Sequence, residues 1–312
     1  MPFLLLESLH PEAEHLLAQH DQIIKSAYVE DALSIARRTE ISAIFTRGKQ
    51  KISCELMQAC GPALRAVCRA GTGLDTIDLV AAKALGITVI FAPGLNAQTT
   101  AEHTLMLLLM AARRAATLNA HVKADHWSIR DTYMGIELNG KTLGIIGLGS
   151  IGRRVAEFGD ALGMKVIYWS RYSRDDRWAY RSLDSLLSEA DAISLHIALT
   201  EETRHLIGAR EFALMKPGVI LVNTARGALI DQAALCKAIE SGRVGAFAAD
   251  VLEQQPPDLR KDECLLDSER VTLTPHVAGL TDRTYREVCL FCAHNVLAVV
   301  KGELPDPRSV FC

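Results

Sequence analysis

Residues 141–152 read KTLGIIGLGSIG, a short apolar run that ends in the pattern GxGxxG. The residues that follow, 152–162, carry apolar side chains at helical spacing. A lone GxGxxG is a weak signal, but a strand before it and a helix after it make the pattern specific for a dinucleotide-binding loop. The stretch therefore predicts the first βα unit of a Rossmann-type sheet.

The glycines of this loop have separate physical roles. Gly147 permits a tight turn, Gly149 lets the backbone approach a pyrophosphate, and Gly152 allows close packing of helix on strand. Ser150 and Ile151 lie between these glycines, just before the expected helix, whose N-terminus offers N–H groups and a partial positive charge to phosphates. We expect these five residues to form the phosphate site.

Short apolar runs alternate with helical patterns along the whole chain. Many of the runs are rich in Val and Ile without polar alternation, as in strands buried on both faces. This rhythm predicts an α/β fold with parallel sheets covered by helices. The expected strands are Phe3–Leu6, Ile41–Thr46, Leu64–Cys68, Ile87–Phe91, Thr142–Ile146, Lys165–Trp169, Ala192–His196, Val219–Asn223, Ala246–Asp250 and Val271–Thr274.

The length of 312 residues predicts two domains, at about 150 residues each. Two long helical patterns, 99–119 and 281–301, flank the α/β unit that carries the glycine loop. We expect a doubly wound dinucleotide-binding domain at 99–282. It would be inserted into a second, flavodoxin-like parallel α/β domain made of residues 1–98 and 283–312, which binds the substrate.

Composition excludes several classes of protein. Hydrophobic residues make up 49% and charged residues 23%, as in ordinary globular proteins, and the net charge of -3 provides no basic face for nucleic acid. No run approaches the roughly 18 apolar residues that span a bilayer, and the first residues do not read as a signal peptide. We expect a cytoplasmic protein with no membrane or nucleic-acid partner.

The cysteines are scattered through a large chain and do not frame a small disulfide-rich domain. Two of them have CxxC spacing, but no second pair accompanies them. We expect structural thiols in a reducing compartment and no metal site. The eight are Cys54, Cys60, Cys68, Cys236, Cys264, Cys289, Cys292 and Cys312.

The end of the next strand bears on the choice of cofactor. A carboxylate usually stands there and binds the adenosine ribose, but this chain has Ser170, followed by Arg171 and, close by, Arg174. No carboxylate repels a 2′-phosphate, and an arginine can accept one. We therefore expect NADP(H) to be preferred, with NAD(H) possible.

Polar side chains follow three later strands of the same unit. Arg226, Gln255 and His276 each come after a predicted strand, and ligands of open α/β sheets bind at the carboxyl ends of strands. Histidine suits proton exchange near neutrality, and arginine binds a carboxylate bidentately. We expect these three to be catalytic. The remaining expected cofactor contacts are His196, Thr224 and Asp250.

At this point the sequence resembles the D-isomer-specific 2-hydroxyacid dehydrogenase family, in its phosphoglycerate dehydrogenase-like branch. The matching segments are Arg69–Asp75, Asn96 with Ala101–His103, the GLGSIG loop, Asn223–Gly227, Asp250 and Pro275–His276. They are spread over nearly the whole chain and occur in the family's order. They are specific for the family and only weakly specific for the substrate.

The resemblance implies hydride transfer between a nicotinamide and C2 of a 2-hydroxy or 2-oxo acid. His276 would exchange the proton on the substrate oxygen, and Arg226 would bind the carboxylate and polarise the carbonyl. Asp250 would accept a hydrogen bond from the nicotinamide carboxamide. Backbone N–H groups near Thr72 and Gly73 would hold the substrate carboxylate, and the family's usual homodimer would form through the cofactor domain.

One position departs from the family. Where this chain has Gln255, the family commonly has a glutamate paired with the histidine, whose charge favours the imidazolium. Gln255 can orient His276 but supplies no charge, so the ring should be less readily protonated. Glu253 remains an alternative partner if the loop is remodelled. A Gln–His pair is the arrangement of the family's formate dehydrogenase branch, whose chemistry needs no proton exchange with substrate.

The substrate side is less determined. Arg47 and Arg69 end two strands of the outer domain, and Asn96 follows a third. In the phosphoglycerate-type branch, residues at these places contact a far phosphate, which suggests a substrate with a second anionic group. The alternative is that the arginines hold the hinge or pair with acids. A rival from another class is a nicotinamide-sensing corepressor, which would bind cofactor without turnover.

Overall fold

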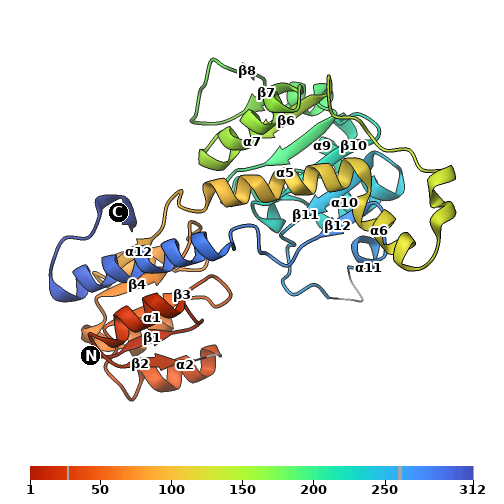
Figure 1. Cartoon of the computed structure of the whole chain (residues 1–312). Coiled ribbons are helices and arrows are strands. Elements are labelled where there is room, and N and C mark those ends of the chain that lie inside the picture. Colours follow the sequence, from red (N-terminus) through yellow and green to blue (C-terminus); the bar gives the residue numbers. More distant parts are fainter. Residues whose placement is uncertain (27, 259–261, 312) are drawn as a thin grey trace. The chain divides into compact units, whose positions relative to one another are not determined.

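The computed structural model describes residues 1–26, 28–258 and 262–311. The chain divides into two compact units, Met1–Asn96 with Leu280–Cys312 and Ala97–Gly279 (Figure 1). Each unit has a mainly parallel β-sheet with helices on both faces. The α/β fold, with a Rossmann-type sheet encoded inside a second α/β unit, is confirmed.

The sheet of the second unit has the doubly wound order β12-β11-β10-β9-β6-β7-β8, and its neighbours pair in parallel. The strand order reverses between β6 and β9, which is where open α/β sheets bind ligands. The strands are β6 (Thr142–Ile146), β7 (Lys165–Trp169), β8 (Ala179–Tyr180), β9 (Ala192–Leu195), β10 (Val219–Asn223), β11 (Val244–Ala249) and β12 (Val271–Leu273).

Helices cover both faces of this sheet. One apolar cluster joins α5 and α7 to one face, and a second joins α8, α9 and α10 to the other. Along β10, Val219 and Leu221 belong to one cluster while Ile220 and Val222 belong to the other, which explains why these strands lack polar alternation. The helices are α5 (Ala97–Arg113), α6 (Ala115–Lys123), α7 (Ser150–Ala161), α8 (Leu183–Glu189), α9 (Ala209–Leu214), α10 (Gln232–Glu240) and α11 (Glu263–Leu266).

The helical pattern expected to run from 99 to 119 is interrupted. Arg114 adopts a left-handed conformation with φ 48°, so α5 ends at Arg113 and α6 begins at Ala115. The break is held by Glu269, whose carboxylate accepts from Arg114 Nη2 at 2.7 Å and whose carbonyl accepts from Thr117 Oγ1 at 3.0 Å. Apolar spacing alone does not register such a tertiary contact.

The sheet of the first unit has the order β13-β5-β4-β3-β1-β2. It is parallel, as expected, except at the short edge strand β13, which pairs antiparallel with β5. Its strands are β1 (Phe3–Leu5), β2 (Ile23–Lys25), β3 (Ala43–Thr46), β4 (Ala66–Arg69), β5 (Thr88–Phe91) and β13 (Val310–Phe311).

Two helical layers cover the first unit's sheet. Helices α1 (Pro11–Ala18) and α12 (Asp282–Lys301) pack on one face, with α12 beside α1 and β4. Helices α2 (Val29–Ala36), α3 (Cys54–Ala59) and α4 (Leu79–Ala84) belong to the other face. Thr281 caps α12 by accepting a hydrogen bond from the Thr284 backbone, as expected for a helix beginning there.

The cysteines differ from the expectation of free thiols throughout. Cys236 of α10 and Cys264 of α11 form a disulfide with their Cα atoms 5.8 Å apart, because α11 packs beside α10 although the two cysteines are 28 residues apart in sequence. Five others are free thiols, namely Cys54, Cys60, Cys68, Cys289 and Cys292. Cys312 lies outside the described residues.

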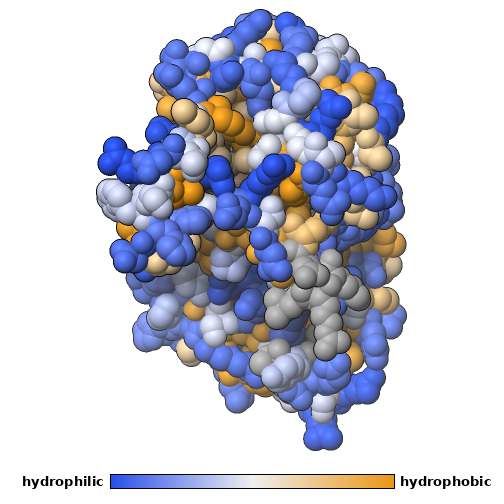
Figure 2. Space-filling view, turned by 90° about the vertical axis from the view of Figure 1, so that its right-hand side faces the viewer, coloured by the Kyte–Doolittle hydropathy of each residue, from blue (hydrophilic) through white to orange (hydrophobic). Residues whose placement is uncertain are grey.

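The surface is mixed in character. Figure 2 shows a face on which hydrophilic side chains predominate and apolar ones are scattered among them. In the described part of the chain, none of the helices has both the length and the apolar character needed to cross a membrane.

Candidate active site

The glycine loop joins β6 to α7 at the carboxyl edge of the sheet. Gly147 has φ +101°, and a Cβ there would lie 2.6 Å from the carbonyl oxygen of His196. A Cβ on Gly152 would lie 2.0 Å from the carbonyl oxygen of Gly147. Both positions therefore require glycine, because a side chain would collide with backbone that cannot move aside.

Gly149 faces open space. A Cβ built on it meets no atom within 4 Å, and α7 begins there without a side-chain cap. The first turn of α7, with Ser150 and Ile151, thus presents its N–H groups to an uncovered approach. This cradle fits the phosphates of a dinucleotide, which such helix N-termini bind.

His196 follows β9, with its carbonyl against Gly147 of this loop, and Thr224 follows β10. The Nε2 atom of His196 lies 2.8 Å from Ser194 Oγ, and burial lowers the pKa of His196 to about 3. The ring is therefore neutral at physiological pH. The Thr224 hydroxyl lies 2.8 Å from Thr104 Oγ1 of α5. Both side chains brace the loops from within the unit.

The carboxyl end of β7 carries the expected ribose-side residues. Ser170 is 6% exposed, and its hydroxyl accepts the Ser173 N–H at 3.1 Å. Arg171 is exposed, with its guanidinium carbon 5.4 Å from the centroid of the Tyr172 ring. Arg174 donates to the Ser170 carbonyl at 2.7 Å and lies 4.2 Å from the Tyr180 ring centroid. Two cations thus flank Ser170.

Arg226 lies in a turn shaped by the last residue of β10. The Asn223 side chain donates to the Arg226 carbonyl at 2.9 Å and accepts the Ala225 N–H at 3.0 Å. A Cβ on Gly227 would lie 2.0 Å from the carbonyl carbon of Leu252. Only glycine lets this turn approach the loop after β11, which carries Gln255.

His276 pairs with Gln255 across this edge. The Nδ1 atom of His276 lies 2.8 Å from Gln255 Oε1, and Gln255 Nε2 donates to the Leu252 carbonyl at 3.0 Å. The second bond orients the amide so that its oxygen faces the ring. An amide oxygen only accepts, so Nδ1 carries the hydrogen and Nε2 is the atom suited to exchange a proton with a substrate.

Glu253, the alternative partner, is engaged elsewhere. Its carboxylate lies 3.0 Å from His205 Nε2 and 3.4 Å from Arg204 Nη1. Of the two candidates, Gln255 is therefore the one that contacts His276.

Asp250 fastens the backbone that carries His276. Its Oδ1 accepts from Thr274 Oγ1 at 2.5 Å and from the Val277 N–H at 2.9 Å, and its Oδ2 accepts from the Ala278 N–H at 2.8 Å. The His276 N–H donates to the Asp250 carbonyl at 2.9 Å. His276 has φ 56°, a left-handed backbone conformation that residues other than glycine seldom adopt. The hydrogen bonds on both sides of His276 hold it in this conformation.

His103 has a place in this cluster that its sequence position did not predict. Its Nε2 lies 2.9 Å from Thr274 Oγ1 and 3.6 Å from Asp250 Oδ1, so it extends the same cluster into α5. The signal was a polar stripe at helical spacing, with buried Thr100 and Thr104, in an otherwise apolar helix. Arg153, directly after Gly152, was also missed.

The expected substrate residues all lie in the first unit. Arg47 follows β3 and its guanidinium carbon lies 4.6 Å from the Tyr285 ring centroid. Thr72 Oγ1 donates to Asn96 Oδ1 at 2.8 Å and lies 3.2 Å from the Ala92 carbonyl. Gly73 lies in the same loop after β4. The Thr72–Asn96 bond ties this loop to the end of the unit's first segment.

Arg69 ends β4 in a cradle of two glycines. A Cβ on Gly71 would lie 1.3 Å from Arg69 Nη1, and one on Gly48 would lie 2.9 Å from Nη2. Nη1 also donates to the Ala70 carbonyl at 3.3 Å. The guanidinium is thus packed flat between two backbone segments and has little freedom to reorient.

Comparisons with known proteins find relatives over most of the chain. The model of the D-isomer specific 2-hydroxyacid dehydrogenase, NAD binding domain, matches residues 105–278. The chain is 41% identical to a glyoxylate reductase of Aeropyrum pernix, over 95% of this chain and 91% of the relative. It is 41% identical to a D-3-phosphoglycerate dehydrogenase of Archaeoglobus fulgidus, over 86% of this chain and 51% of the relative.

Among solved structures, a D-lactate dehydrogenase of Aquifex aeolicus complexed with NAD and lactic acid superimposes with a TM-score of 0.89. It is 31% identical, and the match covers 99% of this chain and 98% of that one.

Replacing Gly149 should separate cofactor binding from folding. The Cβ in Gly149→Ala meets no protein atom, so the melting temperature of the free protein should be unchanged, while cofactor affinity falls about tenfold or more as the phosphate approach is obstructed. Gly152→Ala is the matched control, and it should lower both quantities. Thermal unfolding and isothermal titration with the cofactor measure the two effects. Unchanged affinity in Gly149→Ala would contradict the cradle.

Replacing Asp250 should loosen the His276 loop. In Asp250→Asn an NH2 group takes the place of one of the two oxygens that accept from the Val277 and Ala278 N–H groups. The free energy of unfolding should therefore fall by about 1–3 kcal/mol. Turnover should fall at least about tenfold because the loop no longer holds His276 in place. Thr274→Val removes the hydrogen bond to Asp250 and the contact with His103 but keeps both backbone bonds to Asp250, so it should give a smaller loss of both. Chemical unfolding and kcat are the measurements, and full turnover in Asp250→Asn would rule out the fastening role.

Proposed function

The chain belongs to the D-isomer-specific 2-hydroxyacid dehydrogenase family, and we propose that within it the protein is an NADP(H)-preferring reductase of 2-oxo acids. The coarse activity, NAD(P)-dependent interconversion of 2-hydroxy and 2-oxo acids, follows from the family and its relatives. The observation that carries the acid–base chemistry is the orientation of His276, whose Nδ1 is bonded to Gln255 so that Nε2 is the atom for proton exchange, while Gly227 brings the turn of Arg226 against the loop that carries Gln255.

In this proposal each residue acts on a stated atom. The nicotinamide, when bound, supplies or accepts the hydride at C2. His276 gives or takes the proton of the substrate oxygen through Nε2, and Arg226 binds the carboxylate and polarises the carbonyl. Asp250 accepts a hydrogen bond from the carboxamide as well as fastening the loop, since a carboxylate offers about four acceptor sites.

The NADP(H) preference rests on the end of β7. Ser170 brings no negative charge, and Arg171 and Arg174 flank it with two cations. A 2′-phosphate would therefore meet attraction where an NAD-binding carboxylate would repel it.

We propose a substrate with a second anionic group, such as phosphate, sulfonate or carboxylate. Arg69, held flat in its glycine cradle, and Arg47, stacked on Tyr285, supply two oriented cations after neighbouring strands. The Thr72–Gly73 loop and Asn96 would hold the first carboxylate. The relatives do not decide whether a second anion is present, since one is a glyoxylate reductase and one a D-3-phosphoglycerate dehydrogenase.

Two other functions stay as candidates. The uncharged Gln255 beside His276 suits a dehydrogenase that exchanges no proton with its substrate, as in the formate dehydrogenase branch. A nicotinamide-sensing corepressor would bind cofactor with negligible turnover, and the retained Arg226 and His276 argue against it.

We also propose a homodimer in the cytoplasm. Exposed apolar side chains gather on and after α6, at Val122, Trp127, Met134 and Ile136, and suit contact with a second copy. The five free thiols favour a reducing compartment, whereas the Cys236–Cys264 disulfide counts against one.

Steady-state kinetics with NADPH and NADH test the proposal. The panel should contain glyoxylate, hydroxypyruvate and phosphohydroxypyruvate, which differ in the group beyond the 2-oxo acid. We expect kcat/KM to be higher with NADPH and with the doubly anionic substrate. A higher value with NADH would overturn the cofactor proposal, and equal values with and without the second anion would overturn the roles of Arg47 and Arg69.

Replacing Gln255 with glutamate should shift the pH dependence of reduction. A carboxylate beside the ring favours the imidazolium that donates the proton, so kcat/KM for a 2-oxo acid should persist about one pH unit higher in Gln255→Glu. Glu253→Gln is the control, because Glu253 contacts His205 and Arg204, and its profile should match the wild type. An unchanged profile in Gln255→Glu would count against proton transfer through His276.

A further inference from the structure

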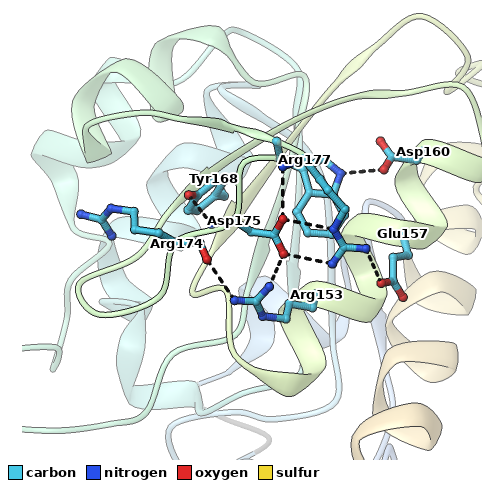
Figure 3. Close-up of polar contacts among 8 residues, drawn as sticks. Arg153, Glu157, Asp160, Tyr168, Arg174, Asp175 and Arg177 are labelled. Atoms are coloured by element: carbon cyan, nitrogen blue, oxygen red, sulfur yellow. Dashed lines mark hydrogen bonds and ion pairs between the residues drawn. The ribbon is translucent and has the colours of Figure 1, made fainter.

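The segment that follows β7, residues 171–178, is tied down by a carboxylate. Asp175 Oδ2 accepts from Arg153 Nη1 and from Arg177 Nη2, the latter at 3.0 Å, and Oδ1 accepts the backbone N–H and Nε of Arg177, each at 3.1 Å. The Asp175 N–H donates to Tyr168 Oη at 3.0 Å (Figure 3). The side chain is 12% exposed.

The two arginines keep this carboxylate ionised. Hydrogen bonds from Arg177, together with the charges of Arg177 and Arg153, lower the pKa of Asp175 to about 2. The bonds are therefore charge-assisted at any working pH, and such bonds are the stronger kind.

The segment is fastened along one face of α7. Arg153 bonds Asp175 and also donates to the Arg174 carbonyl at 3.2 Å. One turn later Glu157 accepts from Arg177 at 3.0 Å, and Asp160 accepts from Trp178 Nε1 at 2.6 Å. Positions 153, 157 and 160 share a helix face, and Figure 3 shows their side chains directed at the segment. This is the helix whose first turn forms the phosphate cradle.

This tie sets where the two cations lie. Between Ser170 and Asp175 the chain has only four residues, and it turns back through the Ser173 N–H bond to Ser170 Oγ. The Arg174 side chain points away from Asp175 (Figure 3). Its Nη1 donates to the Ser170 carbonyl. Asp175 and Glu157 together thus pair with Arg153 and Arg177, and Arg171 and Arg174 remain beside Ser170.

We propose that Asp175 is a positioning residue for cofactor selection: by tying residues 171–178 to α7 it holds Arg171 and Arg174 where a 2′-phosphate is received. This inference rests on the proposed NADP(H) preference. A simple charge effect predicts the opposite sign, because a negative group near a phosphate repels it and its removal would tighten NADP⁺ binding.

The test is the ratio of dissociation constants for NADP⁺ and NAD⁺, measured by titration calorimetry on the full chain without substrate. In Asp175→Asn the charge-assisted bonds are lost, so NADP⁺ should bind about tenfold more weakly while NAD⁺ changes less than about threefold. Amide hydrogen exchange at residues 171–177 of the free variant should rise, with the exchange of β6 and β10 unchanged.

Glu157→Gln is the matched control. It removes the outer partner of Arg177 but keeps the bonds between Asp175 and Arg153, so the ratio should stay within about twofold of the wild type. If Asp175→Asn does not fold, Arg153→Met is the second variant, because it removes the bonds from α7 to Asp175 and to the Arg174 carbonyl. Any contact of Arg153 with the pyrophosphate is common to both cofactors and cancels in the ratio.

The two proposals fail separately. The ratio of dissociation constants in the wild type tests the NADP(H) preference. The change of that ratio in Asp175→Asn tests the role of Asp175, whatever value the wild type has. A ratio unchanged within about twofold, or shifted toward NADP⁺, would overturn the positioning role. A loss confined to NADP⁺ with raised exchange in the segment would establish it.

Discussion

The active-site edge of the second unit depends on two backbone approaches that no side chain allows. A Cβ on Gly152 would lie 2.0 Å from the Gly147 carbonyl oxygen, and one on Gly227 would lie 2.0 Å from the carbonyl carbon of Leu252. The first approach packs α7 on β6 and shapes the phosphate cradle. The second brings the turn of Arg226 against the loop of Gln255. The loops that follow parallel strands lie at the same edge of the sheet. These glycines allow the loops to come into contact there.

Carboxylates then hold the loops that the glycines bring together. Asp250 accepts bonds from both sides of His276, and Asp175 ties the segment after β7 to α7. Each of these carboxylates is shielded from solvent and accepts hydrogen bonds from the backbone as well as from side chains. Its main effect is therefore to hold the backbone of the loop in one conformation. The residues proposed to meet ligands, His276, Arg171 and Arg174, are the more exposed ones.

Much of the fold could be predicted because strands buried on both faces leave a plain signal. All ten expected strands occur, and Thr142–Ile146, Lys165–Trp169 and Val219–Asn223 have the expected bounds. The strands that were missed, β2, β8 and β13, are two or three residues long and lie at or near sheet edges, where too few apolar side chains mark a strand. The break at Arg114 depends on Glu269, more than 150 residues away, which no local pattern reveals.

The sequence by itself determined the α/β fold, the glycine loop and the placement of Arg226, Gln255 and His276 after successive strands. These follow from side-chain size and periodicity, which are local properties of the chain. Tertiary structure decided which groups meet: Gln255 rather than Glu253 beside His276, Asp250 as a fastener of the loop, and Asp175 between two arginines. Such pairings depend on the path of irregular loops, which is set by backbone geometry and distant contacts and leaves no period in the sequence.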